Sequence, residues 1–239
     1  NIKIFFLFLK LFLPYLRDYG RPSYRYLIYA AYNESIKLNY KSCTIIEFGV
    51  GSGTGMKILE KISKNLMNKF NFKINLVGFD SLGLKNLSDY RDVKFKWKEN
   101  FYTGSEENFK KFDIAKIYVG DVKDTLIKMK KNKDSPLAGL IFDLNLYTST
   151  MSAFNVFNIE EKYVLPRIDC YFDDSNTIEY IGERLAIKEF NENNKYKKIA
   201  QNPQTNSLDD ISGWAFYEFH NFKHSKYDTF SNFNAGKSK

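Results

Sequence analysis

Acidic side chains recur along this 239-residue chain at or near the ends of apolar runs. In chain order they are Glu47, Asp80, Asp121, Asp143 and the adjacent pair Asp173 and Asp174. Carboxylates in such places can accept hydrogen bonds from a nucleoside, hold a hard cation or take a proton from a substrate. Ligands of open parallel sheets bind outside the carboxyl ends of the strands, so we expect these groups to converge on one edge of a sheet.

A glycine-rich stretch follows the first apolar run. Residues 44–55 read Thr-Ile-Ile-Glu-Phe-Gly-Val-Gly-Ser-Gly-Thr-Gly, and apolar residues then recur at helical spacing up to Ile62. This pattern predicts a strand, a loop and a helix. Such a loop lets a ligand approach the backbone closely, and the N–H groups at the helix N-terminus favour a polar or anionic ligand. An ordinary strand-to-helix turn is the alternative.

The spacing of these glycines excludes two common nucleotide-binding loops. No frame gives Gly-x-Gly-x-x-Gly, and no Gly-Lys-Ser/Thr triplet closes the run. The frame that fits is acid-x-Gly-x-Gly-x-Gly, formed by Glu47, Gly49, Gly51 and Gly53. It resembles motif I of the class I S-adenosylmethionine-dependent methyltransferases. The resemblance implies that these four residues bind S-adenosylmethionine.

Two further acids suit the nucleoside part of that cofactor. Asp80 ends the second predicted strand, where a carboxylate of a nucleoside-binding α/β fold accepts hydrogen bonds from both ribose hydroxyls. Asp121 ends the third strand and can accept a hydrogen bond from the adenine amino group. A loop acid that caps the next turn is the alternative for Asp80. Helix capping is the alternative for Asp121, and it is compatible with adenine binding.

The chain has three more acids than are needed to accept the hydrogen bonds of a nucleoside: Asp143, Asp173 and Asp174. Oxygen ligands without nearby Cys or His suit a hard cation such as Mg²⁺. We therefore predict that these three side chains are Mg²⁺ ligands. No cluster of Cys and His has the spacing of a zinc site, which excludes zinc-dependent chemistry.

A longer resemblance is carried by Phe-Asp-Leu-Asn-Leu-Tyr-Thr-Ser-Thr at 142–150 and Tyr-Phe-Asp-Asp at 171–174. With motif I included, roughly residues 21–222 are similar to the macrocin- and mycinamicin-type sugar O-methyltransferases. The resemblance implies that an acid after strand four and the acid pair after strand five hold Mg²⁺, which chelates vicinal hydroxyls of a sugar-like acceptor. The family pattern Asp-x-Asp-x-Tyr has Asn145 at its second acid in this chain.

The activity implied by this resemblance is direct transfer of a methyl group from the sulfonium to an acceptor oxygen, an EC 2.1.1 reaction. Bound Mg²⁺ would lower the pKa of the acceptor hydroxyl and orient it. Asp143 is the candidate general base if metal binding does not fully occupy it. A catalytically silent S-adenosylmethionine-binding or nucleoside-binding module is the alternative if Asn145 disables the metal site.

The order of the predicted elements favours an α/β protein. The resemblance implies the Rossmann-like class I methyltransferase fold, with a mostly parallel seven-stranded sheet, helices on both faces and an antiparallel closing strand. We expect an apolar and helical N-terminal extension at 1–40, a methyltransferase domain at 41–239, and a lid or substrate loop at 82–116. The predicted strands are 44–48, 74–80, 117–121, 139–143, 166–174, 197–200 and 214–222. Helices are expected at 21–38, 56–62, 122–130 and 181–191, and a further helix after 144–150 is expected to end at 157.

The charge of the chain is spread rather than concentrated. The 36 basic and 28 acidic residues give a net charge of +8, but the lysines are scattered, and the cluster at 128–133 suits a helix end. We therefore expect no nucleic-acid partner. The basic pI still suggests a nucleic-acid methyltransferase as a further alternative, although the chain lacks the Asn/Asp-Pro-Pro-Tyr/Phe and Pro-Cys segments of such enzymes.

Two cysteines, Cys43 and Cys170, lie beside or inside apolar strands and are predicted to be buried thiols of a cytoplasmic protein. The two histidines, His220 and His224, are expected to make local contacts.

The N-terminal run at 2–16 is strongly apolar but is interrupted by Lys3, Lys10 and Pro14. A membrane span needs about 20 apolar residues, so this run is too short to span. We expect it to pack against the protein or form a homodimer contact. Peripheral contact with a membrane surface and a remnant of a targeting segment remain alternatives.

Overall fold

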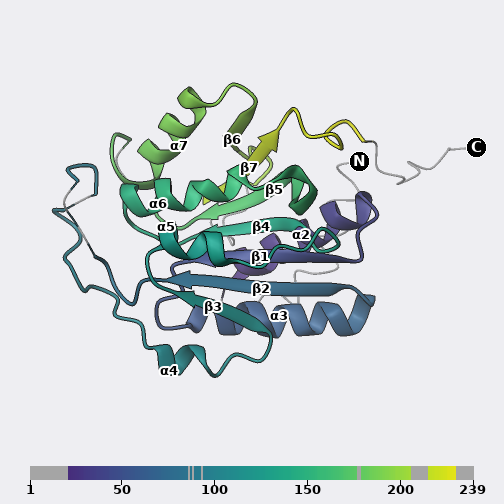
Figure 1. The fold of residues 1–239 in the computed structure, drawn as a ribbon, viewed down its shortest axis with the longest axis horizontal. Helices are drawn as coiled ribbons and strands as arrows, with labels where there is room; N and C mark the ends of the chain where they lie inside the picture. The colour runs from purple at the N-terminus through teal and green to yellow at the C-terminus, as the bar shows by residue number, and fades with distance from the viewer. Residues whose placement is uncertain are drawn as a thin grey trace, which may run out of the picture.

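The computed structural model describes residues 21–85, 87, 89–92, 94–176, 179–205 and 215–229. Within these residues one sheet contains seven strands in the order β3-β2-β1-β4-β5-β7-β6 (Figure 1). The first five strands are parallel, and β7 runs antiparallel to both β5 and β6. The strands are β1 (Ser42–Phe48), β2 (Lys73–Asp80), β3 (Ala115–Val119), β4 (Leu137–Phe142), β5 (Val164–Phe172), β6 (Lys197–Gln201) and β7 (Phe216–Asn221).

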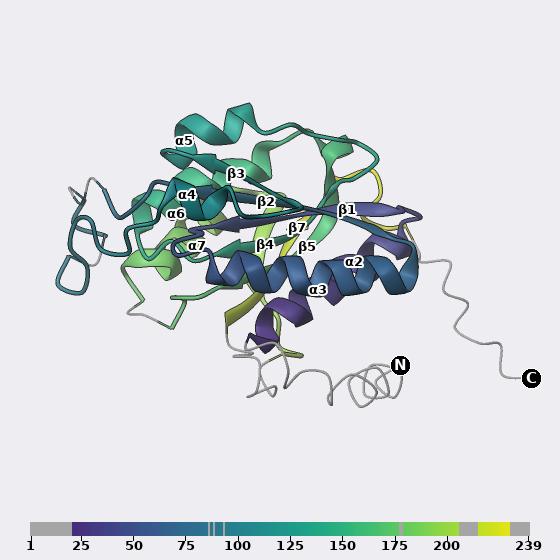
Figure 2. The same ribbon diagram turned by 90° about the horizontal axis from the view of Figure 1, so that it is seen from below.

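Helices cover both faces of this sheet. Figure 2 shows α2 (Pro22–Lys37) and α3 (Thr54–Phe70) on one side of the strands and α5 (Val122–Thr125) on the other. The aromatic rings of α7 (Gly182–Asn193) pack on those that follow α6 (Tyr147–Ala153), through contacts of Phe190 with Phe154 and Phe157. The predicted fold class is therefore confirmed.

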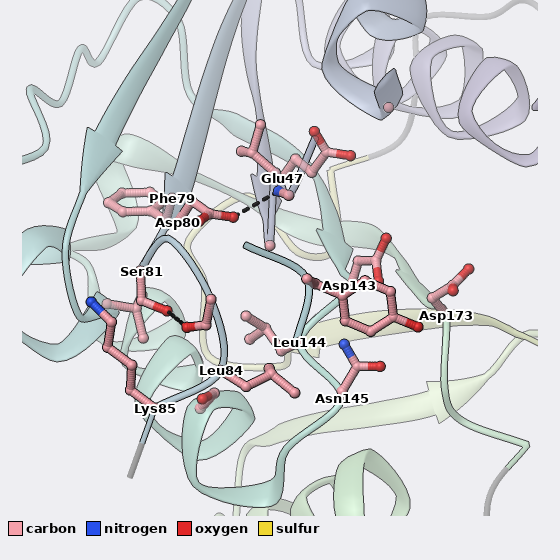
Figure 3. A pocket seen from close by; sticks show the side chains of 18 of the residues that line it. Glu47, Phe79, Asp80, Ser81, Leu84, Lys85, Asp143, Leu144, Asn145 and Asp173 are labelled. Atoms are coloured by element: carbon pink, nitrogen blue, oxygen red, sulfur yellow. Dashed lines mark hydrogen bonds between the residues drawn. The ribbon is translucent and has the colours of Figure 1, made fainter. Parts of the chain in front are cut away.

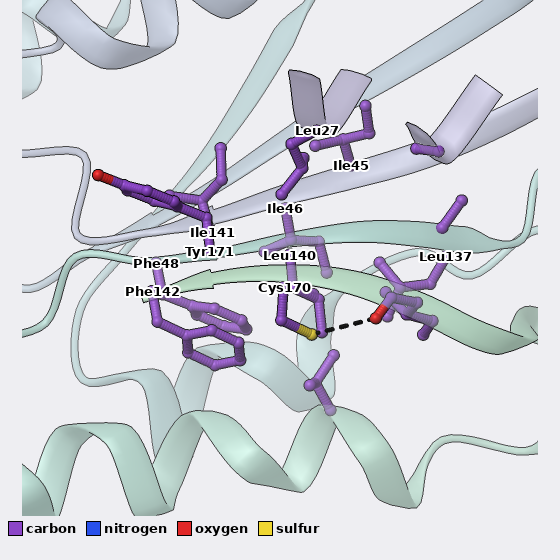
Figure 4. Packing of buried hydrophobic residues seen from close by; sticks show 14 of the residues in the cluster. Leu27, Ile45, Ile46, Phe48, Leu137, Leu140, Ile141, Phe142, Cys170 and Tyr171 are labelled. Atoms are coloured by element: carbon purple, nitrogen blue, oxygen red, sulfur yellow. Dashed lines mark hydrogen bonds between the residues drawn. The ribbon is translucent and has the colours of Figure 1, made fainter. Parts of the chain in front are cut away.

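The sequence explains why the central strands form here. Every residue of β4 is buried, which is the pattern expected of a parallel strand that is covered on both faces. Alternate residues of β1 point to opposite faces, so Ile45 packs toward α2 while Phe48 lies beside Phe142 on the other face (Figure 4). Pro22 occupies the first turn of α2, where its missing N–H costs no hydrogen bond.

A stack of aromatic rings runs across the five parallel strands near their carboxyl ends. Neighbouring ring centroids lie 5.3 Å apart between Tyr118 and Phe79, 5.2 Å between Phe79 and Phe48, 5.2 Å between Phe48 and Phe142, and 4.4 Å between Phe142 and Phe172. The same residues are direct partners in the strand register. We call these five residues the aromatic ladder. The residues that follow the rings of β1, β2, β4 and β5 are therefore level with one another.

Several element boundaries differ from the predictions. The strands β3, β4 and β5 end before Asp121, Asp143 and Asp173, so these acids begin the loops. The helix expected at 122–130 ends at Thr125 and continues as a 3-10 helix, η1 (Leu126–Lys128). The segment between β2 and β3 is largely irregular, as predicted, and contains only the short helix α4 (Glu106–Phe109) among its described residues. Two further 3-10 helices, η2 (Phe154–Asn158) and η3 (Glu161–Tyr163), precede β5.

Other predictions concern single residues and the N-terminus. Cys43 and Cys170 are free and buried, as expected. The ring of His224 contacts the carbonyl oxygens of Glu161 and Val164, and Nδ1 of His220 contacts the Tyr227 hydroxyl, so both histidines make local contacts. None of the helices in the described residues is long and apolar enough to cross a membrane. The run at 2–16 lies outside the described residues, as does Trp214 at the start of the last predicted strand.

The aromatic ladder provides a test of the fold. Phe142 is fully buried and stacks on both of its neighbours. We expect Phe142→Ala to lower the free energy of unfolding by about 3 to 5 kcal/mol, because it removes apolar contacts and leaves a cavity. Chemical denaturation measures the change. Phe95→Ala is the matched control, because Phe95 is 77% exposed, and it should change stability by less than about 0.5 kcal/mol. Equal effects of the two substitutions would contradict a structural role for the ladder.

Candidate active site

A cavity of about 610 Å³ opens at the carboxyl ends of the parallel strands. Figure 3 shows Asp80, Ser81 and Lys85 on one side of it, and Asp143, Asn145 and Asp173 on the other. All of the predicted site residues except Gly53 line this cavity: Glu47, Gly49, Gly51, Asp80, Asp121, Asp143, Asp173 and Asp174. The expected convergence on one edge of the sheet is therefore observed.

The three glycines of the loop have different physical roles. Gly49 has a φ of +88°, and a Cβ placed on it would lie 1.9 Å from the backbone oxygen of Asp143, so only glycine allows β1 and β4 to end this close together. Gly51 has a φ of +55°, but a Cβ there would meet no atom within 4 Å. Gly53 immediately precedes α3, and its Cβ would touch the ring of Phe112 at 3.0 Å. Gly53 thus serves the turn into the helix, and its cofactor contact stays a prediction.

Asp80 fastens the glycine loop to the end of β2. Its carboxylate accepts hydrogen bonds from the backbone N–H of Gly51 at 2.7 Å and of Leu82 at 2.6 Å. Burial raises the pKa of Asp80, and these hydrogen bonds oppose that rise. A carboxylate can accept about four hydrogen bonds, so the group keeps capacity for the hydroxyls of a ligand.

Asp121 caps the short helix α5. Its side chain accepts a hydrogen bond from the backbone N–H of Lys123 at 3.0 Å, and Nζ of Lys123 lies 3.4 Å from its other oxygen. The capping alternative is therefore confirmed. Because Asp121 also lines the cavity, capping leaves its predicted contact with adenine available.

Carboxyl groups crowd the opposite end of the cavity, where β4 and β5 end. Burial, and next the charge of Asp173, raise the pKa of Asp143 to about 7. Burial also raises the pKa of Asp174, although Nζ of Lys96 lies 3.2 Å from it. The Tyr171 hydroxyl donates a hydrogen bond to Asp173 at 2.9 Å. This end of the cavity thus favours the binding of a cation.

The fit of Mg²⁺ to this cluster rests on the chemistry of its donors. Three carboxylates line the cavity, and their repulsion would be relieved by a divalent cation. Asn145 lines the same wall and is buried, with a φ of +61°. In the described part of the chain, however, no three Asp, Glu, His or Cys side chains are already grouped as a metal site. The donor types are those that Mg²⁺ prefers, but the arrangement of the described side chains is not that of a metal site.

Glu183 is a member of this cluster that the sequence did not reveal. It is fully buried in the first turn of α7, and its Oε2 accepts a hydrogen bond from the backbone N–H of Asp174 at 3.0 Å. Burial, and then the charges of Asp174 and Asp143, raise its pKa well above the usual value. Glu183 therefore holds the turn that carries the acid pair, and its raised pKa favours the protonated form.

The start of helix α2 also contributes to the site, although the sequence predicted only a helix at 21–38 as part of an N-terminal extension. Nη1 of Arg21 donates a hydrogen bond to the Tyr24 hydroxyl at 2.6 Å, and that hydroxyl donates to Oε1 of Glu47 at 2.7 Å. Burial raises the pKa of Glu47 to about 8, opposed by the hydrogen bond from Tyr24. The spacing of Arg21 and Tyr24, three residues apart at a helix start, is the signal that could have placed both on one face.

The segment between β2 and α4 forms one wall of the cavity through Leu84, Lys85, Trp97 and Tyr102. This segment is held in place by hydrogen bonds to α6 and α7. Arg91 donates a hydrogen bond to the Tyr147 hydroxyl at 2.9 Å, its backbone oxygen accepts one from Gly182 at 3.0 Å, and the Tyr147 hydroxyl also binds Glu189. Tyr147 therefore anchors this wall and is not among the residues that line the cavity.

Comparisons with known proteins bear on the fold. No protein-family model matches the sequence, and a search of curated proteins finds no significant match. Among solved structures, the O-methyltransferase NovP has a TM-score of 0.54 at 18% identity, over 70% of this chain and 71% of that protein. The calicheamicin methyltransferase CalS11 has a TM-score of 0.50 at 19% identity, over 68% of each chain. The chain has the Rossmann-like methyltransferase fold.

A second structure of CalS11, described as a TDP-rhamnose 3′-O-methyltransferase, matches with a TM-score of 0.47 at 16% identity, over 80% of this chain and 75% of that one.

The glycine loop of this methyltransferase fold gives a direct test of the cavity. We expect Gly51→Ala to cost about 1 kcal/mol of stability because of its positive φ, and to weaken binding of S-adenosylhomocysteine at least about tenfold because the new methyl group fills ligand space. Thermal unfolding and calorimetric titration measure the two effects. Asn71→Ala is the matched control, since Asn71 has a φ of +48° at the end of α3, outside the cavity. Wild-type affinity in Gly51→Ala would remove Gly51 from the binding site.

Proposed function

We propose that this protein is an S-adenosylmethionine-dependent methyltransferase that acts on a hydroxyl group of a small molecule. The observation that carries the proposal is the cavity itself. It combines a glycine loop that leaves open space above Gly51, a buried carboxylate on β2 and a capping carboxylate after β3. The fold shared with NovP and CalS11 supports this assignment.

The donor would lie across the ends of β1, β2 and β3. Asp80 would accept hydrogen bonds from the ribose hydroxyls, and Asp121 from the adenine amino group. Gly49 and Gly51 let the backbone approach the sulfonium end of the molecule. With the donor in this order, the transferable methyl group would lie near the carboxyl cluster after β4 and β5.

The acceptor would occupy the space between that cluster and the wall that contains Trp97 and Tyr102. Apolar aromatic surface beside carboxylates suits a sugar-like ring with polar edges, and Nε1 of the buried Trp97 has no hydrogen-bond partner among the described residues. The resemblance to sugar O-methyltransferases, together with these side chains, supports a sugar or related polyol as the acceptor.

We further propose that Asp143, Asp173 and Asp174 hold Mg²⁺ with the acceptor. The ion would lower the pKa of the acceptor hydroxyl. In the transfer the acceptor oxygen forms a bond to the methyl carbon, the bond from that carbon to sulfur breaks, and the hydroxyl proton leaves to a base. Asp143 is the candidate for that base if metal binding leaves one of its oxygens free.

A catalytically silent module that binds the cofactor is the second candidate. It is favoured by Asn145 at the position of an expected acid and by the absence of a preassembled metal site in the described residues. A cytoplasmic location, the lack of a nucleic-acid partner and a homodimer or membrane contact through residues 2–16 stay predictions.

Removal of the acid pair separates the two candidates. We expect Asp173→Ala combined with Asp174→Ala to abolish Mg²⁺-stimulated methyl transfer while leaving the dissociation constant for S-adenosylmethionine within about threefold, because the pair lies away from the donor. Transfer to a panel of sugars and catechols is measured with Mg²⁺ and with a chelator, and donor binding is measured by calorimetry. Asp113→Ala is the matched control, because Asp113 pairs with Lys64 on the surface.

Each outcome of this experiment has a distinct meaning. Failure of the wild-type protein to bind S-adenosylmethionine would overturn the donor assignment. Binding without any transfer across the panel would favour the silent module, and transfer that is unchanged in the double variant would refute the metal assignment.

A further inference from the structure

A long loop projects from the cavity end of the sheet. Figures 1 and 2 show the segment between β2 and α4, in blue, extending beyond the other elements at the carboxyl ends of the strands. Two backbone hydrogen bonds join its two sides. The N–H of Leu84 donates to the oxygen of Phe101 at 3.2 Å, and the N–H of Asn100 donates to the oxygen of Leu84 at 2.8 Å. The loop is therefore closed at its base.

The far part of this loop carries much of the exposed apolar surface of the described residues. We call the described residues of 90–102 the rim segment. Its exposed rings are those of Tyr90 (82%), Phe95 (77%), Tyr102 (55%) and Phe101 (47%). Phe101, Tyr102 and the buried Trp97 contact one another, with ring centroids 5.0 to 5.9 Å apart, and the last two line the cavity. Contiguous exposed apolar surface of this kind usually marks an interaction site.

The backbone of the rim segment is held at both ends. Near its start, the fully buried carboxylate of Asp92 accepts hydrogen bonds from the backbone N–H of Thr148 at 2.9 Å and from its hydroxyl at 3.0 Å. At its end, Tyr102 has a φ of +59°, which a bulky residue adopts only where the surrounding structure holds it. The exposure of these rings is therefore a property of the folded backbone.

Basic side chains alternate with the rings. Residues 94–98 read Lys-Phe-Lys-Trp-Lys, and all three lysines are exposed. Nζ of Lys96 lies 4.6 Å from the centre of the Trp97 ring. The acids of the rim segment are Asp92, which is buried, and Glu99, which is exposed. Its outer surface thus combines aromatic rings with an excess of positive charge.

We propose that the rim segment docks the protein on an anionic lipid bilayer. The rings of Tyr90, Phe95 and Phe101 enter the headgroup region, and Lys94 and Lys98 face the anionic lipids. Aromatic rings favour the boundary between lipid and water, and lysines are attracted to a negatively charged membrane surface. A projecting loop with separate rings and cations suits a fluid bilayer, which needs no matching shape. The net charge of +8 favours the approach to such a surface.

This contact is separate from the one expected for the N-terminal run at 2–16, and it does not depend on methyl transfer. Because Tyr102 lines the cavity, docking through the rim segment brings this side of the cavity next to the lipid headgroups.

Sedimentation with vesicles tests the proposal on the full chain. Vesicles of phosphatidylcholine alone are compared with vesicles that also contain phosphatidylglycerol. We expect the wild type to bind the anionic vesicles at least about tenfold more tightly, and Phe95→Ala to weaken this binding at least about fivefold because a ring no longer enters the interface. Ile127→Ala is the matched control. Ile127 is also 77% exposed, but it lies in η1, and its variant should bind like the wild type.

A second pair of variants tests the charge. We expect Lys94→Gln combined with Lys98→Gln to weaken binding to the anionic vesicles at least about fivefold and to reduce its dependence on salt. Lys131→Gln combined with Lys133→Gln is the matched control. These two lysines are also exposed and their loss changes the net charge equally, but they precede β4 at the amino ends of the strands.

The outcomes decide whether the rim segment binds lipid. The proposal is overturned if the wild type does not bind the anionic vesicles. It is also overturned if the protein binds them but Phe95→Ala and the variant of Lys94 and Lys98 bind equally well, because another segment is then responsible. Self-association is measured by sedimentation velocity, and nucleic-acid binding by titration with a single-stranded oligonucleotide. Loss of either in Phe95→Ala, without vesicle binding by the wild type, would assign the surface to that partner instead. Thermal unfolding checks that all variants are folded.

Discussion

The aromatic ladder is the constraint on which the site depends. Strand register is fixed where side chains pack on a buried face, and a slip of one residue would turn every side chain of the strand to the other face. Rings on neighbouring strands stack from Tyr118 to Phe172, with ring centroids no more than 5.3 Å apart. The backbone ladder continues past the rings, with hydrogen bonds from Gly49 to Phe79 and from Asp143 to Phe48, each 2.9 Å long. The residues directly after the rings of β1, β2, β4 and β5 therefore line the cavity at one level; they are Gly49, Asp80, Asp143 and Asp173.

This arrangement brings carboxyl groups close together, and several neighbouring side chains reduce the repulsion between them. Lys96 lies beside Asp174, Arg21 lies near Asp143, and burial raises the pKa of Glu183. Asp80, by contrast, accepts hydrogen bonds from two backbone N–H groups and so organises the glycine loop, and the charge of Lys85 adds a smaller contribution. The two ends of the cavity differ electrostatically for this reason. At one end the carboxylate accepts hydrogen bonds from the backbone, and at the other end several carboxyl groups lie close together.

Much of the fold and part of the site could be predicted because the signals are local in sequence. An apolar strand, a glycine run and an acid directly after an apolar run are each read within a few residues, and Glu47, Asp80 and Asp143 were found in this way. Glu183 was missed because its importance comes from burial and from a contact with the backbone of Asp174, which no spacing reveals. The role of Arg21 was missed because the sequence indicated only a helix at 21–38 and not which of its residues reach the cavity. The early end of α5 was missed because apolar periodicity continues through the 3-10 turn that follows it.

We propose that the cavity binds S-adenosylmethionine across the ends of β1, β2 and β3. A crystal structure of the protein with S-adenosylhomocysteine would test this proposal. We expect the ribose hydroxyls to contact Asp80, the adenine to lie beside Asp121, and the sulfur to lie over the glycine loop on the side of Asp143. A ligand bound elsewhere, or an adenosine that makes no contact with Asp80, would contradict it.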